Sequence, residues 1–120
     1  MNRDMEGMLS LLRNMLIKAL GSNLELLVLY GSRARGDEEP DSDMDLLVVL
    51  KNVNQGDREK IHRIAYNLMW EREFQPLISL NIIDREHYTL LSEAGSSYLG
   101  NILREGKPLW LASETKADVG

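Results

Sequence analysis

The chain has 120 residues, a hydrophobic fraction of 43% and a formal net charge of −5 at pH 7, which fit one globular domain with a single core. The acidic balance argues against general nucleic-acid binding, because a phosphate backbone needs a basic surface. The absence of cysteine excludes disulfides and thiolate metal sites, and no apolar run reaches the ~18 residues that a bilayer-spanning helix needs. We therefore expect a cytoplasmic protein without a membrane segment.

Alternating hydrophobic patterns predict an α/β (α+β) domain, in which a small mixed sheet is covered by helices. Apolar residues at helical spacing indicate helices, whereas short runs rich in Leu, Val and Ile between turn residues indicate strands. We expect residues 1–112 to form a single domain and residues 113–120 to form a flexible tail. The predicted elements are, in chain order, a helix over 3–20, strands over 24–30 and 43–50, a helix over 55–74, a strand over 77–83, and helices over 85–93 and 97–105.

Ordinary structural roles account for several conspicuous side chains. Trp70 is expected on the inner face of its helix, and His62 on the outer face of the same helix. Asp84 is expected to cap the helix that follows it, because Glu86 and apolar residues come next. Trp110 is expected to cover the sheet or to enter a dimer interface, and packing on the sheet is the simpler of the two.

The most informative segment lies between the first two predicted strands. The first strand stops at Gly31, where a residue without a β-carbon lets the backbone bend and lets a ligand approach closely. The hydroxyl of Ser32 can cap a helical turn or donate to a phosphate oxygen. If a short helix begins here, its unpaired N–H groups provide a phosphate site. The turn alone is a weak signal, since most Gly-Ser turns only redirect the chain.

Two carboxylates stand at the start of the next predicted strand. Asp43 and Asp45 project from one face of a strand while Met44 points the other way, because side chains alternate. This spacing brings two hard oxygen ligands to one point. Mg²⁺ is often held by one or two carboxylates together with waters and substrate phosphates. A turn that can receive a phosphate and a pair of metal ligands together predict a nucleotide-handling site.

The sequence GSRARG at 31–36, followed by SDMDLLVVL at 42–50, resembles the defining motif of the DNA polymerase β-type nucleotidyltransferase superfamily. It is similar in particular to the minimal nucleotidyltransferase (MNT) branch, whose small single-domain members include MntA-like antitoxins. The likeness extends from about residue 24 to residue 110, and its sharpest part lies at 31–46. It implies a polymerase β-like nucleotidyltransferase fold.

The resemblance also implies roles for particular residues. Gly31 and Ser32 would contact the triphosphate of ATP or of another nucleoside triphosphate. Asp43 and Asp45 would be the catalytic ligands of Mg²⁺ or Mn²⁺. The further nucleotide contacts that we expect are Arg33, Arg35 and Ser42.

One position departs from the pattern of the superfamily. Its enzymes normally carry a third carboxylate on the next strand, which helps to deprotonate the acceptor hydroxyl, and two-metal transfer needs enough oxygen ligands. The matching strand over 77–83 contains no acid, and Ser79 or Asn81 occupies the equivalent position. The departure is compatible with phosphate and metal binding, but it weakens the activation of an acceptor.

Three functions therefore remain open. The first is Mg²⁺-dependent transfer of a nucleoside monophosphate, above all AMP from ATP, onto a hydroxyl of a partner protein or a small molecule. The resemblance implies that such a protein acts with a HEPN-type partner as the antitoxin of a toxin–antitoxin pair, and a homodimer is left open. The second is a catalytically weakened module that binds a nucleotide or a partner without turnover. The third is a domain with an idle site, against which the intact turn and carboxylates argue.

Overall fold

The computed structural model describes residues 3–37, 39 and 42–112, so the predicted tail at 113–120 lies outside the described residues. No helix in these ranges is long and apolar enough to cross a bilayer. The elements in chain order are α1 (Arg3–Leu20), the short 3-10 helix η1 (Gly21–Asn23), β1 (Leu24–Tyr30), α2 (Ser32–Arg35), β2 (Met44–Leu50), α3 (Gln55–Glu71), β3 (Ile78–Asp84), α4 (Arg85–Glu93), α5 (Ser97–Glu105) and β4 (Lys107–Leu111).

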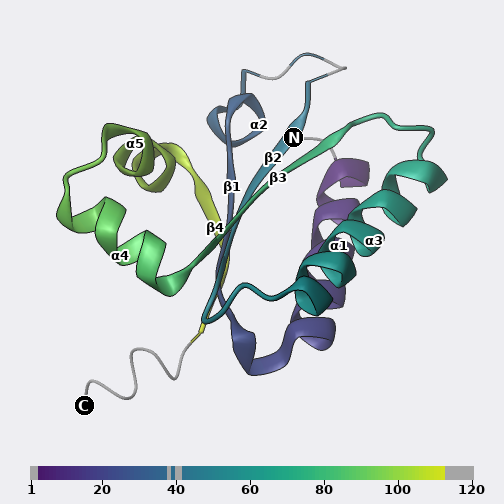
Figure 1. Cartoon of the computed structure of the whole chain (residues 1–120). Helices are drawn as coiled ribbons and strands as arrows, with labels where there is room; N and C mark the ends of the chain where they lie inside the picture. The colour runs from purple at the N-terminus through teal and green to yellow at the C-terminus, as the bar shows by residue number, and fades with distance from the viewer. Residues whose placement is uncertain (1–2, 38, 40–41, 113–120) are drawn as a thin grey trace.

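A four-stranded mixed sheet of order β3-β2-β1-β4 forms the centre of the molecule. β1 is antiparallel to both β2 and β4, whereas β2 and β3 run parallel and are joined by a crossover through α3. α1 and α3 cover one face of the sheet, and α4 and α5 cover the other (Figure 1). The predicted fold class, a small mixed sheet covered by helices, is confirmed.

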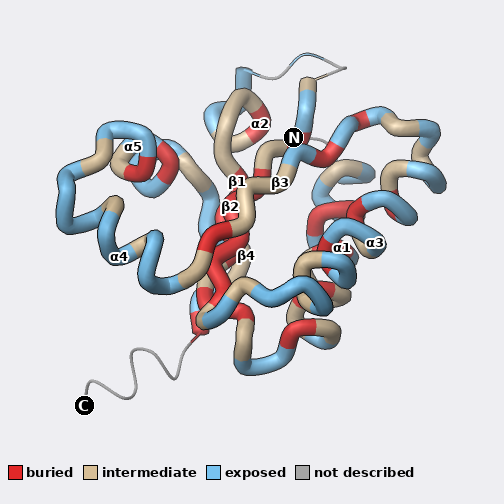
Figure 2. The backbone as a smooth tube through the Cα atoms, viewed as in Figure 1, coloured by how far each residue is buried: buried red, intermediate tan, exposed pale blue. Residues whose placement is uncertain are grey.

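Each face of the sheet has its own hydrophobic core, with the buried strands between the two (Figure 2). The residues of β2 alternate between these cores: Leu46 and Val48 pack under α1 and α3, while Leu47 and Val49 pack under α4 and α5. Because side chains alternate along a strand, Asp45 falls on the α4/α5 face together with Leu47. The acidic end of β2 therefore opens toward α5.

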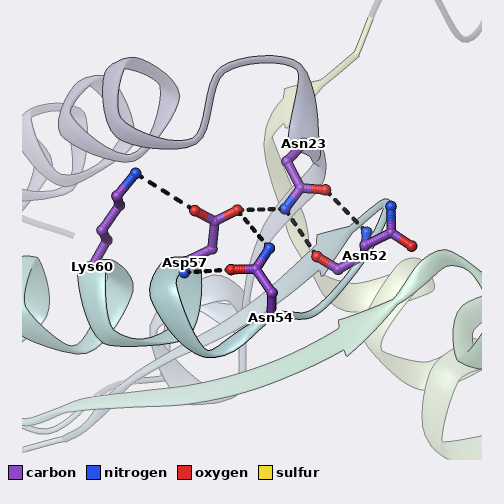
Figure 3. A network of polar contacts seen from close by, with 5 residues as sticks. All are labelled: Asn23, Asn52, Asn54, Asp57 and Lys60. Carbon is purple, nitrogen blue, oxygen red and sulfur yellow. Dashed lines mark hydrogen bonds and ion pairs between the residues drawn. The ribbon is translucent and has the colours of Figure 1, made fainter.

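A polar network closes the end of the β1–β2 pair that lies far from Gly31 (Figure 3). Asn23 Nδ2 donates to the Asn52 carbonyl at 2.9 Å and to Asp57 Oδ2 at 2.6 Å, and Asn23 Oδ1 accepts from the Asn52 amide at 2.9 Å. Asn54 caps α3 by accepting from the Asp57 amide at 2.8 Å, and Lys60 Nζ lies 3.6 Å from Asp57 Oδ1. The network ties the start of β1 and the end of β2 to the first turn of α3.

The prediction that Trp70 lies on the inner face of its helix is wrong. The side chain of Trp70 is 65% exposed and contacts the rings of Tyr66 and Phe74. The inner face of α3 is set by Ala65 and Leu68, which are buried. Trp70 comes two residues after Leu68, which places it more than half a turn around the helix, on the outside.

β4 is a strand that the sequence pattern does not indicate. Pro108 removes a backbone donor and argues against a strand, but an edge strand tolerates it where the missing N–H would face outward. Trp110 lies in this strand and packs against the α1/α3 core, as its expected packing role requires, and its indole N–H donates to the Leu24 carbonyl at 3.4 Å. β2 also begins at Met44, so that Asp43 precedes the strand instead of opening it.

Gly106 lets the end of α5 approach β1 closely. A β-carbon at this position would lie 2.6 Å from Val28 Cγ1 and 2.9 Å from the Leu29 carbonyl oxygen, and it would overlap the Ile102 carbonyl oxygen. The Gly106 amide instead donates to that Ile102 carbonyl at 2.8 Å. The position of α5 against the sheet is therefore set by backbone contact.

Candidate functional site

The ends of three strands meet where the sequence motif lies. Tyr30, the last residue of β1, pairs with Asp45 near the start of β2, and Asp45 pairs in turn with Ser79 near the start of β3. Asp43 is exposed just before β2, and Asp45 is partly buried. This pairing brings the turn at Gly31, the residues Asp43 and Asp45 and the start of β3 to one end of the sheet. α2 lies at the same end of β1 (Figure 1).

Gly31 allows the carboxylate of Asp45 to lie directly against the turn. Its φ of 80° is in the left-handed region, which glycine adopts without strain. Its carbonyl accepts hydrogen bonds from the amides of Ala34 and Arg35, both at 3.1 Å, which form the turn of α2 that Ser32 begins. A β-carbon here would overlap Asp45 Oδ2 and lie 3.3 Å from Asp45 Cγ. Glycine is required twice, by the backbone conformation and by the close carboxylate.

The electrostatic surroundings of Asp45 disfavour its charge in the ligand-free chain. Burial raises the pKa of Asp45, and the negative charge of Asp43 raises this pKa further. A hydrogen bond from the side chain of Ser79 and the positive charge of Arg35 act in the opposite direction. A divalent cation beside Asp43 and Asp45 would relieve the repulsion between the two carboxylates.

Arg33 and Ser42 shape the loop between α2 and β2. Arg33 is only 4% exposed, and its Nε donates to the Ser42 carbonyl at 3.0 Å. The Ser42 hydroxyl accepts from the Glu39 amide at 2.7 Å. These contacts fix the entry of the chain into Asp43. The expected roles of Arg33 and Ser42 as nucleotide contacts stay predictions.

Arg35 extends from α2 at the mouth of the site. Its side chain is 45% exposed, with Nε 3.4 Å from Asp37 Oδ2 and Nη1 3.7 Å from Glu105 Oε1. Exposed ion pairs of this kind contribute little to stability, so the guanidinium can exchange these partners for a phosphate at small cost. The structure is thus compatible with Arg35 as a phosphate contact, which stays a prediction.

The structure separates the two candidates for the position of the missing third carboxylate. Ser79 lies opposite Asp45, and its side chain hydrogen-bonds to the Asp45 carboxylate. Asn81 lies one step further along β3, and its side-chain amide donates to the hydroxyl of Tyr98 on α5. Asp84 is occupied as the predicted N-cap, because its Oδ1 accepts from the His87 amide at 2.7 Å. Ser79 therefore occupies the place where a third acid would join the pair.

Asp43 and Asp45 are the residues that could hold a metal. Within the described residues, no group of three or more Asp, Glu, His or Cys side chains could hold a metal ion. Two carboxylates are nevertheless an adequate protein contribution for Mg²⁺, which usually retains waters and takes phosphate oxygens from a substrate. The donor set, hard oxygen only, fits Mg²⁺ or Mn²⁺ better than a softer metal.

A pocket beside the motif contains residues that sequence reasoning does not single out. On α5, Tyr98 is followed by Asn101 three residues later and by Glu105 seven residues later. This is helical spacing, so the three polar side chains lie along one side of the helix. This periodicity is the signal from which their role could have been inferred. The pocket has a volume of about 320 Å³ and is lined by Tyr30, Gly31 and Arg35 on one side and by Tyr98, Asn101, Ile102 and Glu105 on the other.

Solved structures share this fold at low sequence identity. One is a toxin–antitoxin with AMP-PNP, 20% identical, with 88% of this chain and 76% of that chain covered and a TM-score of 0.55. Another, from Sulfolobus solfataricus, is described provisionally as a nucleotidyltransferase. It is 20% identical, with 89% of this chain and 80% of that chain covered and a TM-score of 0.56. Both likenesses concern the fold.

Sequence comparison finds closer relationships. A protein of Methanocaldococcus jannaschii with the provisional name protein adenylyltransferase MJ0141 is 36% identical over 62 residues, which make up 49% of this chain and 63% of that protein. The chain therefore spans less than two thirds of the length of this relative. The sequence model of the nucleotidyltransferase domain matches residues 13–93, from α1 to the end of α4. Because this match covers more than half of the sequence, the chain belongs to the nucleotidyltransferase domain family.

Proposed function

We propose that this chain is a Mg²⁺-dependent adenylyltransferase, which transfers AMP from ATP onto a hydroxyl group of a partner protein. The observation that carries the proposal is the contact between Gly31 and Asp45. The turn that would receive the phosphates and the carboxylate that would hold the metal lie against each other, with Asp43 next to them. The name of the Methanocaldococcus jannaschii relative supports ATP as the donor and a protein as the acceptor.

In this proposal each residue has a defined task. Asp43 and Asp45 hold the metal, which, when bound, neutralises the triphosphate and lowers the pKa of the acceptor hydroxyl. The backbone of Gly31 and the hydroxyl of Ser32 bind phosphate oxygens, because a residue without a β-carbon permits close approach. Arg35 adds a positive charge at the mouth of the site. Catalysis then depends on positioning and charge neutralisation, as expected for phosphoryl transfer.

The acceptor protein is proposed to be a HEPN-type toxin, for which this chain acts as antitoxin. The similarity to a toxin–antitoxin of known structure supports this partner, as does the resemblance of the motif at 31–46 to the MNT branch. Pull-down with a HEPN-type protein, followed by mass analysis of that protein after incubation with Mg²⁺ and ATP, tests this assignment.

Calorimetric titration with ATP, with and without Mg²⁺, tests the site itself. Binding should require Mg²⁺ and should be lost in the double variant Asp43→Asn/Asp45→Asn. Glu39→Gln is the matched control, because it removes an exposed acid from the same loop and should bind as the unmodified chain does. Binding that is independent of Mg²⁺, or that survives in the double variant, would contradict the assignment of the site.

A second candidate function is a module that binds the nucleotide without efficient transfer, and Ser79 is the observation that favours it. Ser79 places a hydroxyl beside Asp45 where an acid could act as a general base. Ser79→Asp should then raise the transfer rate by about 10²-fold, the lower end of the contribution of a general base. Asn81→Asp, one step further along β3, is the matched comparison. An unchanged rate in Ser79→Asp would show that the absence of a third acid at this position is not what limits transfer.

A further inference from the structure

A tyrosine hydroxyl of the chain itself extends into the candidate site. Tyr98 is the second residue of α5, and its hydroxyl accepts a hydrogen bond from the side-chain amide of Asn81 on β3. Asn81 follows Ser79 on the same face of the strand, the face on which Asp45 also lies. The contact therefore brings a hydroxyl from a surface helix across to the strand that borders the two carboxylates.

The same hydroxyl is connected to the other side of the site. Tyr98 hydrogen-bonds to the side chain of Tyr30, and Tyr30 is close enough to Asp45 for the two groups to interact electrostatically. Tyr30 also precedes Gly31 and pairs with Asp45 between β1 and β2. The Tyr98 hydroxyl is thus held between two residues that flank Asp45, one on β1 and one on β3.

Tyr98 is accessible to a bound nucleotide. Its side chain is 48% exposed and forms part of the wall of the pocket of about 320 Å³ that begins at Gly31 and Arg35. A triphosphate placed on the turn at Gly31 would have this pocket beside it. A phenol oxygen is chemically equivalent, as an acceptor, to the hydroxyl that the proposed function requires.

We propose that Tyr98 is itself an acceptor, so that the chain adenylylates its own Tyr98 when Mg²⁺ and ATP are bound. The inference rests on the proposed function. In the reaction, a bond forms between Tyr98 Oη and the α-phosphorus of ATP as the bond from that phosphorus to the bridging oxygen breaks. Pyrophosphate leaves, and the phenolic proton passes to water. Each chain reacts once, because AMP on Tyr98 fills the pocket in front of Gly31.

Tyr98 is the acceptor rather than Tyr30 because of where each residue is attached. Tyr30 ends a central strand, where its neighbours in β2 and the turn at Gly31 restrict it. Tyr98 stands in the first turn of a nine-residue helix at the surface, and its side chain is 48% exposed where it lines the pocket. Asn81 donates to the Tyr98 oxygen, which orients the phenol toward the strand that borders the two carboxylates.

Incubation of the full chain with Mg²⁺ and ATP, followed by intact mass measurement and peptide mapping, tests the proposal. The expected result is one adenylyl group per chain, located on Tyr98, at a rate that does not depend on protein concentration. Tyr98→Phe should not be modified. Tyr88→Phe is the matched control, because Tyr88 lies on α4 over the same face of the sheet and should leave the modification in place. The modified chain should also lose calorimetric binding of Mg²⁺-ATP.

The outcomes that overturn the inference are distinct from those that overturn the proposed function. Mg²⁺-dependent ATP binding without a gain in mass refutes self-adenylylation alone, as does a group that maps to another residue or persists in Tyr98→Phe. A rate that rises with protein concentration refutes the intramolecular step. Absence of Mg²⁺-dependent ATP binding refutes the proposed function and, with it, this inference.

Discussion

The two ends of the β1–β2 pair each carry a prominent aspartate in opposite circumstances. Asp57, at one end, accepts from Asn23 Nδ2 at 2.6 Å and Asn54 Nδ2 at 3.3 Å and lies 3.6 Å from Lys60 Nζ. Asp45, at the other end, lies against a glycine turn, where burial and then the charge of Asp43 raise the pKa of Asp45. The charge of Asp57 is stabilised by hydrogen-bond donors and a lysine, whereas the charge of Asp45 is destabilised by its surroundings.

The comparison distinguishes a structural acid from a candidate functional one. An acid surrounded by donors stabilises the fold and has little remaining capacity for a ligand. An acid beside a second carboxylate destabilises the ligand-free fold, and it gains most from a cation that binds there. Replacing Asp57 should therefore affect stability more than ligand binding, and replacing Asp45 should affect ligand binding more than stability.

The largest expected effect is the loss of transfer in Asp45→Asn. The substitution retains the shape of the side chain but removes its charge, so it should lower the transfer rate by about 10²–10³-fold, the range for losing one electrostatic contributor to a transition state. The rate of AMP incorporation into the acceptor measures it. Asp57→Asn, with the same change of charge at the other end of the sheet, should leave the rate unchanged. Equal losses of transfer rate in Asp45→Asn and Asp57→Asn would contradict the distinction between a functional and a structural acid.

A second prediction separates backbone strain from crowding of the carboxylate. Gly31→Ala and Gly36→Ala both place a β-carbon at positive φ, 80° and 85°. Gly36→Ala, in the left-handed helical region, should lower the free energy of unfolding by about 1–2 kcal/mol. Gly31→Ala, whose ψ of −160° lies in a region that only glycine populates, should lower it by about 1–3 kcal/mol. Only the alanine at 31 would overlap Asp45, so only Gly31→Ala should also lose Mg²⁺-dependent ATP binding. Denaturant unfolding and calorimetry measure the two effects. Retained binding in Gly31→Ala would show that Asp45 does not need its position against the turn.

The third prediction concerns the network in Figure 3. Asp57→Ala leaves the side-chain amide of Asn23 without one acceptor and removes the ion-pair partner of Lys60. The variant should lower the free energy of unfolding by about 1–3 kcal/mol, as expected when a polar group loses its partner. Its affinity for Mg²⁺-ATP should equal that of the unmodified chain. A change in that affinity would mean that the two ends of the sheet are coupled.

The smallest expected effect is a gain in stability from Asp45→Asn in the absence of ligand. The pKa of Asp45 is raised in the folded chain, so the protonated side chain contributes to the stability of the fold. This stabilisation is fully present below the unfolded pKa and is lost as pH rises through the folded pKa. At pH 7 the ionised Asp45 therefore opposes folding, and the asparagine variant should have the higher Tm. The difference should disappear toward acidic pH, where Asp45 is protonated. A lower Tm for the variant at pH 7 would contradict the sign of this argument.

Local rules were sufficient to predict most elements of this fold from its sequence. Strands such as 24–30 are short apolar runs that end at a glycine, and the helix over 85–93 begins after the cap residue Asp84. The prediction is wrong for Trp70 because composition indicates burial, whereas the direction of a side chain depends on its angle around α3. It omits β4 because Pro108 is unfavourable in a strand unless the strand lies at an edge, which only the assembled sheet determines.

The sequence likewise predicts one part of the candidate site and not another. The proximity of Gly31 to Asp45 follows from two adjacent strands and a short connection, so the motif alone indicates it. The contact between Asn81 and Tyr98 joins residues on different elements, and it depends on how α5 packs over the sheet. No spacing rule in the sequence predicts how α5 packs over the sheet. The choice between Ser79 and Asn81 was likewise open until the register of β2 and β3 was known.

The close approach of Gly106 to β1 has a consequence for selectivity. Because the end of α5 already touches the backbone of Leu29, the helix has no clearance in which to move inward when a ligand binds. At this end of the helix, the pocket between α5 and Gly31 is therefore narrowed by side chains such as Glu105 and not by an inward shift of the helix. We therefore expect the selectivity of the pocket to depend on the side chains that line it and not on an inward shift of α5.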